Sequence, residues 1–263
     1  MKSRFKFNKL NRKPHEHVKL WKIMPNLVTL IALCLGVTSI IFAIKKDWQT
    51  AILLIFFAGL LDGVDGRLAR FLSTSSPFGA ELDSLCDFVN FGIAPGLLNY
   101  FWIINLKEAE GSKVTWCLSL IYCACMAIRL ARFNTSQDTN FSKKFFLGVP
   151  APCCAILILS PIAFNIDTEI FSEANIWIYQ SYTLLISFLC SSTIPTFSIK
   201  SIAIKQKYLK FFLFLLMCLF GLVLINVWLT FSIFSLIYLA TIPISWYKGF
   251  MMQKELNLNQ DNT

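Results

Sequence analysis

Long apolar stretches separated by short polar segments run through most of this 263-residue chain. Several stretches exceed the ~20 residues that an α-helix needs to cross the hydrocarbon core of a bilayer. The pattern predicts an all-α integral membrane protein with about eight spans, at roughly 24–44, 49–72, 78–105, 114–135, 145–165, 177–195, 209–226 and 229–247. The first stretch follows 23 residues that include basic ones, so we interpret it as an anchor and not as a cleaved signal peptide.

Composition agrees with this interpretation, and the charge distribution orients the helices. Apolar residues make up 56% of the chain and the mean hydropathy is +0.61, which is rare in a soluble domain. With both termini in the cytoplasm, eight spans leave four of the 24 Lys and Arg residues outside, namely Lys45, Lys46, Lys107 and Lys113. This distribution follows the positive-inside rule. We therefore attribute the net charge of +9 to topology and contact with anionic lipids, and not to nucleic acid.

The chain divides into three parts. Residues 1–23 form a basic juxtamembrane arm, which is either an interfacial helix in the headgroup plane or a disordered segment. Residues 24–248 form one membrane domain with short loops, and residues 249–263 form a polar C-terminal tail. Nine cysteines are scattered through the apolar stretches without a C-x-x-C pair, which indicates small packing residues and not a disulfide framework.

Four aspartates interrupt the second and third apolar stretches, namely Asp62, Asp65, Asp83 and Asp87. Each costs about 3 kcal/mol at the bilayer centre on insertion scales, so such residues usually mark a functional site. At helical spacing, Asp62 and Asp65 share one face of the second helix, and Asp83 and Asp87 share one face of the third. The short link at 71–78 makes these helices antiparallel neighbours. We expect the four carboxylates to meet near the cytoplasmic end.

The chemistry of such a cluster is that of a divalent-cation site. Carboxylate oxygens are the ligands that Mg²⁺, Mn²⁺ and Ca²⁺ prefer. Four carboxylates balance two divalent ions, and paired ions are a recurring device of phosphoryl chemistry. Gly66 and Gly79 leave room for a bulky ligand near the backbone. Arg70, on the acidic face of its helix, can pair with a phosphate.

The aspartates lie in a recognisable motif. Residues 62–87 read D-G-V-D-G-R-L-A-R, then eight residues, then G-x3-D-x3-D. This resembles the signature of the CDP-alcohol phosphotransferases, the membrane enzymes that build phospholipid headgroups. The surrounding SPFGAELDSLCDFVNFGIAPG, RLARFN at 129–134, FFLGVPAP at 145–152 and IPTFSIKS at 194–201 are similar to the bacterial phosphatidylserine synthases within that family.

The resemblance implies roles for the residues of the motif. The metal ligands would be Asp62, Asp65 and Asp83, and Asp87 would be a further ligand or the general base. The CDP-lipid site would be shaped by Gly66, Ala69, Arg70 and Gly79. The expected reaction transfers the phosphatidyl group of CDP-diacylglycerol to the hydroxyl of L-serine and releases CMP, with Mg²⁺ or Mn²⁺, as two ions. Such an enzyme would lie in the bacterial inner membrane, with its site near the cytoplasmic face. The family commonly forms homodimers, and this chain permits one.

The acceptor leaves alternatives open. Serine needs a cation for its carboxylate, and the candidates near the cytoplasmic end are Arg129, Arg132, Asn134 and Lys200. The same chemistry would accept glycerol 3-phosphate, an inositol compound or choline. A divalent-cation transporter would also use membrane carboxylates, but it predicts acidic residues spread through the bilayer depth and in two repeats. Here they cluster at one end, and no repeat is visible.

Overall fold

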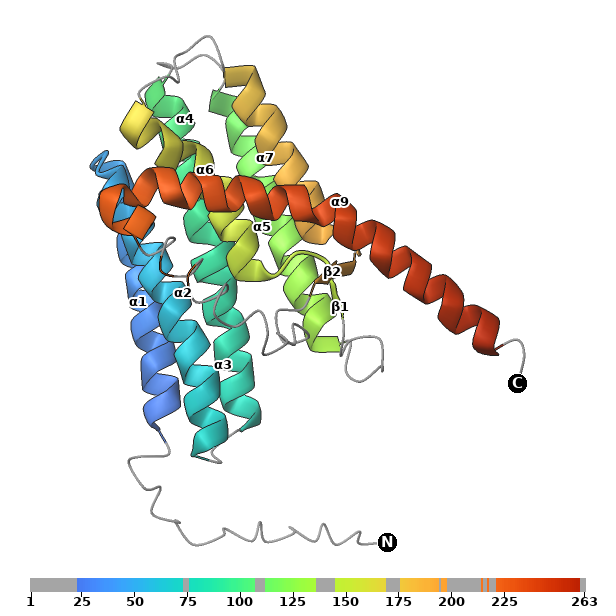
Figure 1. Cartoon of the computed structure of the whole chain (residues 1–263). Helices are drawn as coiled ribbons and strands as arrows, with labels where there is room; N and C mark the ends of the chain where they lie inside the picture. Colours follow the sequence, from blue (N-terminus) through green and yellow to red (C-terminus); the bar gives the residue numbers. More distant parts are fainter. Residues whose placement is uncertain are drawn as a thin grey trace, which may run out of the picture.

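Apolar helices make up most of the protein in the computed structural model (Figure 1). The structure describes residues 23–72, 76–106, 112–135, 145–168, 176–193, 195–197, 214, 217 and 221–260. The α-helices are α1 (Met24–Ile44), α2 (Trp48–Phe71), α3 (Pro77–Asp87), α4 (Ala94–Leu106), α5 (Ser112–Thr135), α6 (Ala151–Thr168), α7 (Ile176–Ser191) and α9 (Val227–Gln260). A π-helix, η2 (Phe88–Ile93), joins α3 to α4, and the short strands β1 (Phe145–Leu147) and β2 (Pro195–Phe197) pair antiparallel.

The predicted spans and the observed helices largely coincide. The spans expected at 24–44, 49–72 and 114–135 correspond to α1, α2 and α5, and the span at 78–105 is the continuous run of α3, η2 and α4. Within the described part of the chain, four helices are long and apolar enough to cross a membrane: α1, α5, α6 and α9. The protein is therefore a helical integral membrane protein. The number of eight spans and the cytoplasmic side of both termini stay predictions.

Two expectations fall largely outside the described residues. The basic arm at 1–23 is described only at Ile23, and the span expected at 209–226 only at residues 214, 217 and 221–226. Residues 249–260, expected to belong to a polar tail, continue α9, which ends at Gln260. After Gly249 this segment contains neither Gly nor Pro, and it is rich in helix-forming Met, Gln, Lys, Glu and Leu.

The predicted bounds of two spans are wrong by a few residues. The span expected to begin at residue 145 begins at Ala151, because Phe145–Leu147 pair with β2. Gly148 follows in the left-handed region with φ of 83°, and Pro150 disfavours a helix in the residue before it. The pair of strands β1 and β2, the β-ribbon, also shortens the span expected at 177–195, since α7 ends at Ser191 and β2 begins four residues later.

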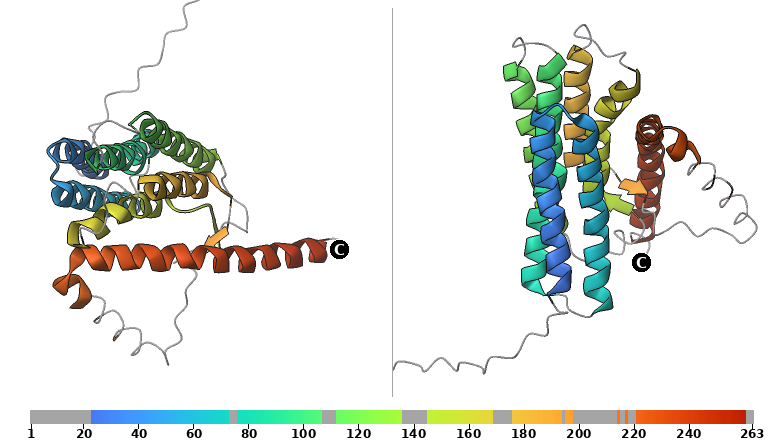
Figure 2. Two further views of the ribbon diagram at one scale, coloured as in Figure 1. Left: turned by 90° about the horizontal axis from the view of Figure 1, so that it is seen from above. Right: turned by 90° about the vertical axis from the view of Figure 1, so that its left-hand side faces the viewer.

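The helices form a bundle that one long helix crosses. The rod formed by α3, η2 and α4 lies beside α1, and α2 packs along α1 as well (Figures 1 and 2). The helices α5, α6 and α7 complete the bundle on the other side of the rod. α9 runs across the bundle on one face and packs against α6 and β2. The apolar core therefore lies between the rod, α5, α6 and α7.

Hydrogen bonds between helices fix the rod in the apolar core. Asn99 of α4 donates to the Thr183 hydroxyl of α7 at 3.0 Å. The Tyr122 hydroxyl of α5 donates to the Phe91 carbonyl oxygen in η2 at 2.7 Å. Interhelical bonds of this kind stabilise a membrane bundle by about 0.6 kcal/mol each on average. Here they hold the segment that follows Asp87 against two neighbouring helices.

Gly36 allows α1 to approach the π-helix closely. A Cβ at Gly36 would collide with Oδ1 of Asn90 and would lie 3.0 Å from Cγ of the same residue. Asn90 is fully buried, and neither amide atom has a hydrogen-bond partner among the described residues. Because Asn90 lies three residues after Asp87, this contact sets the distance between α1 and the end of α3.

We expect Gly36→Ala to destabilise the protein. The added methyl group meets a buried side chain in a packed core, and overpacking of this kind costs about 1–3 kcal/mol. The measurement is the melting temperature of purified protein in detergent, followed by tryptophan fluorescence. Asn90→Ala in the same chain removes the colliding amide and should restore most of the loss.

Gly63→Ala is the matched control on α2. An added Cβ there meets nothing within 4 Å, so its melting temperature should equal or slightly exceed that of the wild type. An unchanged melting temperature for Gly36→Ala would contradict the close contact with Asn90.

Candidate functional site

α2 and α3 bring three carboxyl groups together. One oxygen from each of Asp62, Asp83 and Asp87 lies within 4.8 Å of the others, and all three side chains are half-buried. Negative charges at this separation repel one another strongly where water is scarce. An arrangement of acidic side chains like this one is able to hold a metal ion.

Asp65 lies beside this group but faces α1. Its side chain is 3% exposed, and its Oδ2 accepts a hydrogen bond from the Thr29 hydroxyl at 2.6 Å. Oδ1 of Asp65 and Oδ1 of Asp87 are both buried without a hydrogen-bond partner in the described part of the chain. A buried acceptor without a partner is costly. A cation would satisfy these oxygens, and a set of carboxylate oxygens suits Mg²⁺ or Mn²⁺.

A cleft of about 260 Å³ opens next to the carboxylates, between α1, α2 and α3. Asp65 and Asp83 contribute to its wall. The residues expected from the motif to shape a ligand site all line it, namely Gly66, Ala69, Arg70 and Gly79. The Nε of Arg70 donates to the Gly66 carbonyl oxygen at 3.0 Å, so the guanidinium group is held at the exposed rim of the cleft.

The two glycines of the cleft have different structural roles. A Cβ at Gly66 would meet nothing within 4 Å, so this residue leaves open space for a ligand. A Cβ at Gly79 would lie 3.1 Å from Oδ1 of Asn26 and 3.2 Å from Oγ of Ser76. Gly79 therefore lets α1 approach the first turn of α3 and close one side of the cleft.

The sequence reasoning missed the contribution of α1. Asn26 and Thr29 lie one turn apart at the beginning of α1, directly after Pro25, and all three residues line the cleft. Two polar residues one turn apart at the beginning of a largely apolar helix were the signal that could have revealed them. They make α1 the third wall of the site.

The acceptor candidates Arg129 and Asn134 lie near the helices that carry the carboxylates. Arg129 is close enough to Asp87 for its charge to act on that carboxyl group, and its Nε donates to the Val149 carbonyl oxygen at 2.6 Å. Nδ2 of Asn134 donates to Oγ of Ser84 on α3 at 2.9 Å. The end of α5 is therefore fixed beside α3.

Arg132 is bound to the backbone at the end of α7. Its Nη1 donates to the carbonyl oxygens of Ser191 at 2.9 Å and of Ser192 at 3.4 Å. Gly148 packs against the same segment, since a Cβ there would lie 2.6 Å from the Ser192 carbonyl oxygen. Arg132 thus holds the connection after α7, against which Gly148 packs. Lys200, the remaining acceptor candidate, lies outside the described residues.

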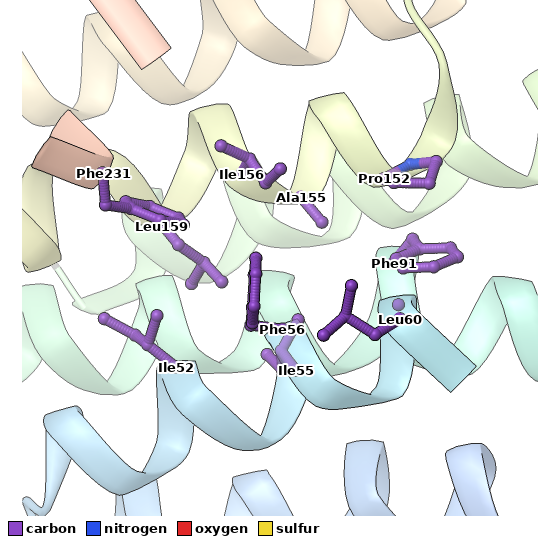
Figure 3. A pocket seen from close by; sticks show the side chains of 11 residues that line it. Ile52, Ile55, Phe56, Leu60, Phe91, Pro152, Ala155, Ile156, Leu159 and Phe231 are labelled. Carbon is purple, nitrogen blue, oxygen red and sulfur yellow. The ribbon is translucent and has the colours of Figure 1, made fainter. Parts of the chain in front are cut away.

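A second cavity, lined only by apolar side chains and glycine, lies between α2, η2, α6 and α9 (Figure 3). Its volume is about 160 Å³. Leu60 of α2 and Phe91 of η2 face it from one side, and Phe231 of α9 faces it from another. Leu60 precedes Asp62 by two residues, and Phe91 follows Asp87 by four. The apolar cavity is therefore built on the same two helical segments as the carboxylate group.

We expect Thr29→Val to weaken cation binding. The substitution keeps the side-chain shape but removes the hydroxyl that donates to Asp65, so the carboxylate loses the bond that orients it. Loss of such an outer hydrogen bond typically lowers metal affinity about 10–100-fold. The measurement is the Mn²⁺-dependent rise in the melting temperature of the purified protein.

Thr38→Val is the matched control on the same helix. The Thr38 hydroxyl is exposed and donates to the Cys34 carbonyl oxygen of its own helix at 2.6 Å, so its loss should leave Mn²⁺ binding unchanged. Equal Mn²⁺ affinity in Thr29→Val and the wild type would rule out the supporting role of Thr29.

Comparison with known proteins identifies the family of this chain. The family model of the CDP-alcohol phosphatidyltransferases matches residues 22–191. This range includes α1 to α7, and with them the carboxylate group and the whole cleft. The apolar cavity and the contacts of α9 extend beyond it.

Several curated proteins named CDP-diacylglycerol–serine O-phosphatidyltransferase are similar to this chain. One from Mycobacterium leprae is 32% identical over 228 residues, which cover 85% of this chain and 74% of the relative. One from Helicobacter pylori is 33% identical over 235 residues, or 88% of this chain and 93% of the relative. One from Mycobacterium bovis is 34% identical over 191 residues, 71% of this chain and 65% of that longer protein. The chain belongs to the CDP-alcohol phosphatidyltransferase family.

Proposed function

We propose that this protein transfers the phosphatidyl group of CDP-diacylglycerol to the hydroxyl of L-serine, giving phosphatidylserine and CMP. The observation that carries the proposal is the meeting of three carboxylates at the edge of a cleft lined by the four other signature residues. The names of the relatives from Mycobacterium leprae and Helicobacter pylori support serine as the acceptor. The same reaction with glycerol 3-phosphate, an inositol compound or choline is the alternative that the experiment below separates.

Asp62, Asp83 and Asp87, with Asp65 beside them, would hold divalent cations, Mg²⁺ or Mn²⁺ and two in number. The close carboxylate oxygens and the buried, unpartnered Oδ1 atoms of Asp65 and Asp87 fit this role. The family is metal-dependent. When bound, the cations would neutralise the pyrophosphate and stabilise the charge that develops on the reacting phosphoryl oxygens.

The two cavities fit the two ends of CDP-diacylglycerol. The cleft would hold the cytidine diphosphate part, with Gly66 leaving space near the backbone and Arg70 pairing with a phosphate. The apolar cavity of Figure 3 would receive part of an acyl chain, because its lining offers only apolar surface. Both cavities are built on α2, so one helix would align the polar and apolar parts of the lipid.

Asp87 would act as the general base. Its carboxyl group would accept the proton of the serine hydroxyl while the serine oxygen attacks the lipid-side phosphorus. The bond from that phosphorus to the oxygen of CMP then breaks, and CMP leaves. Asp87 is suited to this role because it ends α3 and is followed at once by η2, and π-helical segments occur frequently at functional sites.

Arg129 and Asn134 would face the acceptor, and Arg132 would position it indirectly. The charge of Arg129 acts on Asp87, so a carboxylate bound to this guanidinium group would lie near the base. Arg132 is already engaged with two backbone carbonyls. Its role would therefore be to hold the segment after α7, which leads toward Lys200.

The site would operate within one membrane domain at residues 24–248. The arginines in the last turns of α2 and α5 support a site at the cytoplasmic face of a bacterial inner membrane. A homodimer is compatible with the many apolar side chains exposed on the helices. The membrane lipids themselves would supply the CDP-diacylglycerol.

Purified protein should release CMP from CDP-diacylglycerol with L-serine and not with glycerol 3-phosphate, inositol or choline. Asp87→Asn should lower the rate with serine about 10²–10⁴-fold, the usual contribution of a general base. The measurement is release of labelled CMP in detergent–lipid micelles. Glu81→Gln, an exposed carboxylate on the same helix, is the control and should keep wild-type activity. CMP release with glycerol 3-phosphate alone would refute serine as the acceptor.

Removal of divalent cations should abolish CMP release. Treatment with EDTA leaves the carboxylates without their counter-charge, and added Mg²⁺ or Mn²⁺ should restore the rate. Asp83→Asn replaces one carboxylate of the group by a neutral amide, so half-maximal activity should need about 10-fold or more cation. Full activity in EDTA after extensive dialysis would contradict the metal site.

A further inference from the structure

A third cavity lies at the end of the bundle opposite to the carboxylate group. Its volume is about 360 Å³, which exceeds that of the cleft. The connection between α1 and α2 forms one wall, and the ends of α4 and α6 form the others (Figure 1). Trp48, in this cavity, lies 14 residues before Asp62 on α2, which is about 21 Å at 1.5 Å per residue. The third cavity and the cleft are therefore separate sites.

The lining of the third cavity combines charged, amide and aromatic side chains. Lys46 and Asp47 bring one positive and one negative charge to adjacent positions. The remaining polar and aromatic lining residues are Gln49, Asn105, Asn165, Trp48 and Trp102. Tryptophan is enriched where membrane proteins meet the headgroup layer, because its ring is apolar and its N–H is polar. The lining is therefore suited to a molecule that has both charged and apolar parts.

The backbone at Lys46 adopts a conformation that the turn alone does not require. Its φ is 63°, and it is the only residue other than glycine with a positive φ in the described part of the chain. The turn is fixed by backbone hydrogen bonds of 3.0 Å from Lys46 N–H to the Ala43 carbonyl and from Asp47 N–H to the Phe42 carbonyl. Glycine would adopt this φ without strain. Strained backbone is often found at binding sites, so the lysine side chain is a candidate for such a role.

The side chain of Asp47 is oriented by the helix that follows it. Its Oδ1 accepts a hydrogen bond from the Thr50 N–H at 3.1 Å and caps α2, which leaves Oδ2 for a ligand. Lys45, the other lysine of the turn, lies outside the lining, and its Nζ is 5.7 Å from the centroid of the Phe42 ring. The cavity thus receives one ammonium group and one carboxylate from this turn.

This pair of charges matches the two charges of a zwitterionic phospholipid headgroup. The Lys46 ammonium can bind a phosphate, and the Asp47 carboxylate can bind an ammonium group. A headgroup that carries only negative charge would be repelled by Asp47. Ile162 and Ile166 add apolar surface for the beginning of an acyl chain. The 24 residues of α2 extend about 36 Å, which exceeds the ~30 Å hydrocarbon core, so both of its ends reach a headgroup layer.

We propose that the third cavity binds a phospholipid whose headgroup contains a phosphate and an ammonium group, as phosphatidylethanolamine does. The inference does not depend on the proposed function, because it concerns the other end of the bundle. The bound lipid would connect the turn between α1 and α2 with the ends of α4 and α6. A lipid that binds the folded protein in this way raises its melting temperature by mass action.

The test titrates purified protein in detergent micelles with dioleoylphosphatidylethanolamine and follows the melting temperature by tryptophan fluorescence. EDTA is present, so cations at the carboxylate group do not contribute. The wild type should be stabilised by this lipid more than by dioleoylphosphatidylglycerol. Lys46→Gln removes the charge that binds the phosphate, so its apparent Kd for the lipid should be about tenfold higher. Lys45→Gln is the matched control and should respond as the wild type does.

Two further variants separate binding from folding. Lys46→Gly relieves the strained φ, so its melting temperature without lipid should equal or exceed that of the wild type while its response to the lipid is lost. Asp47→Asn keeps a good N-cap residue but removes the negative charge, so it should no longer distinguish the zwitterionic lipid from phosphatidylglycerol. Arg70→Gln, in the cleft, should keep the wild-type response to the lipid.

Three results would overturn this site. The first is an equal response of Lys46→Gly and the wild type to dioleoylphosphatidylethanolamine. The second is equal stabilisation of the wild type by phosphatidylglycerol. The third is an equal rise with O-phosphoethanolamine at the same concentration, since this soluble molecule carries both charges without acyl chains. Loss of CMP release with serine, by contrast, would refute the proposed function and leave this lipid site unaffected.

Discussion

The repulsion between carboxylates held within 4.8 Å is the constraint on which the rest of this site depends. Two antiparallel helices could separate their acidic faces to relieve it, and the surrounding structure prevents that. Thr29 of α1 donates to Asp65 and keeps one carboxylate turned toward α1. The unpartnered oxygens of Asp65 and Asp87 are left for a cation. The protein therefore holds an unfavourable charge arrangement ready for a ligand, which is the condition for electrostatic preorganisation.

The packing around η2 makes this arrangement rigid. Gly36 brings α1 against Asn90, and the Tyr122 hydroxyl binds the Phe91 carbonyl from the opposite side. Both contacts lie within four residues of Asp87, so the end of α3 is fixed from two directions. The π-helical turn changes the direction in which side chains leave the rod, and it separates the polar segment of α3 from the apolar segment of α4. The Asp87 carboxyl group therefore has little freedom to move away from Asp62 and Asp83.

Much of the fold and of the carboxylate group could be predicted from the sequence, because both depend on local patterns of residues. The apolar stretches located the helices, and the i, i+3 and i+4 spacing together with the short link at 71–78 predicted the meeting of Asp62, Asp83 and Asp87. The orientation of Asp65 could not be predicted in this way, since it depends on a hydroxyl 36 residues earlier in the chain. The pairing of β1 with β2 is equally long-range, and three apolar residues before a proline look like the beginning of a helix until a partner strand is known. Asn26 and Thr29 of α1 can be recognised as polar in the sequence, but the sequence does not show which helix they contact.

The arginines of α5 fix the two connections next to the β-ribbon formed by β1 and β2. Where helices end near a membrane surface, carbonyl groups need donors that neighbouring residues must supply. Arg129 and Arg132 supply them to Val149, Ser191 and Ser192, and so fix the connections before α6 and after α7. These connections in turn lead into the β-ribbon against which α9 packs. The carboxylate group and the cleft lie wholly within the range that the family model matches, whereas α9 lies beyond it. Substitutions on α9 would therefore leave the carboxylate group and the cleft intact.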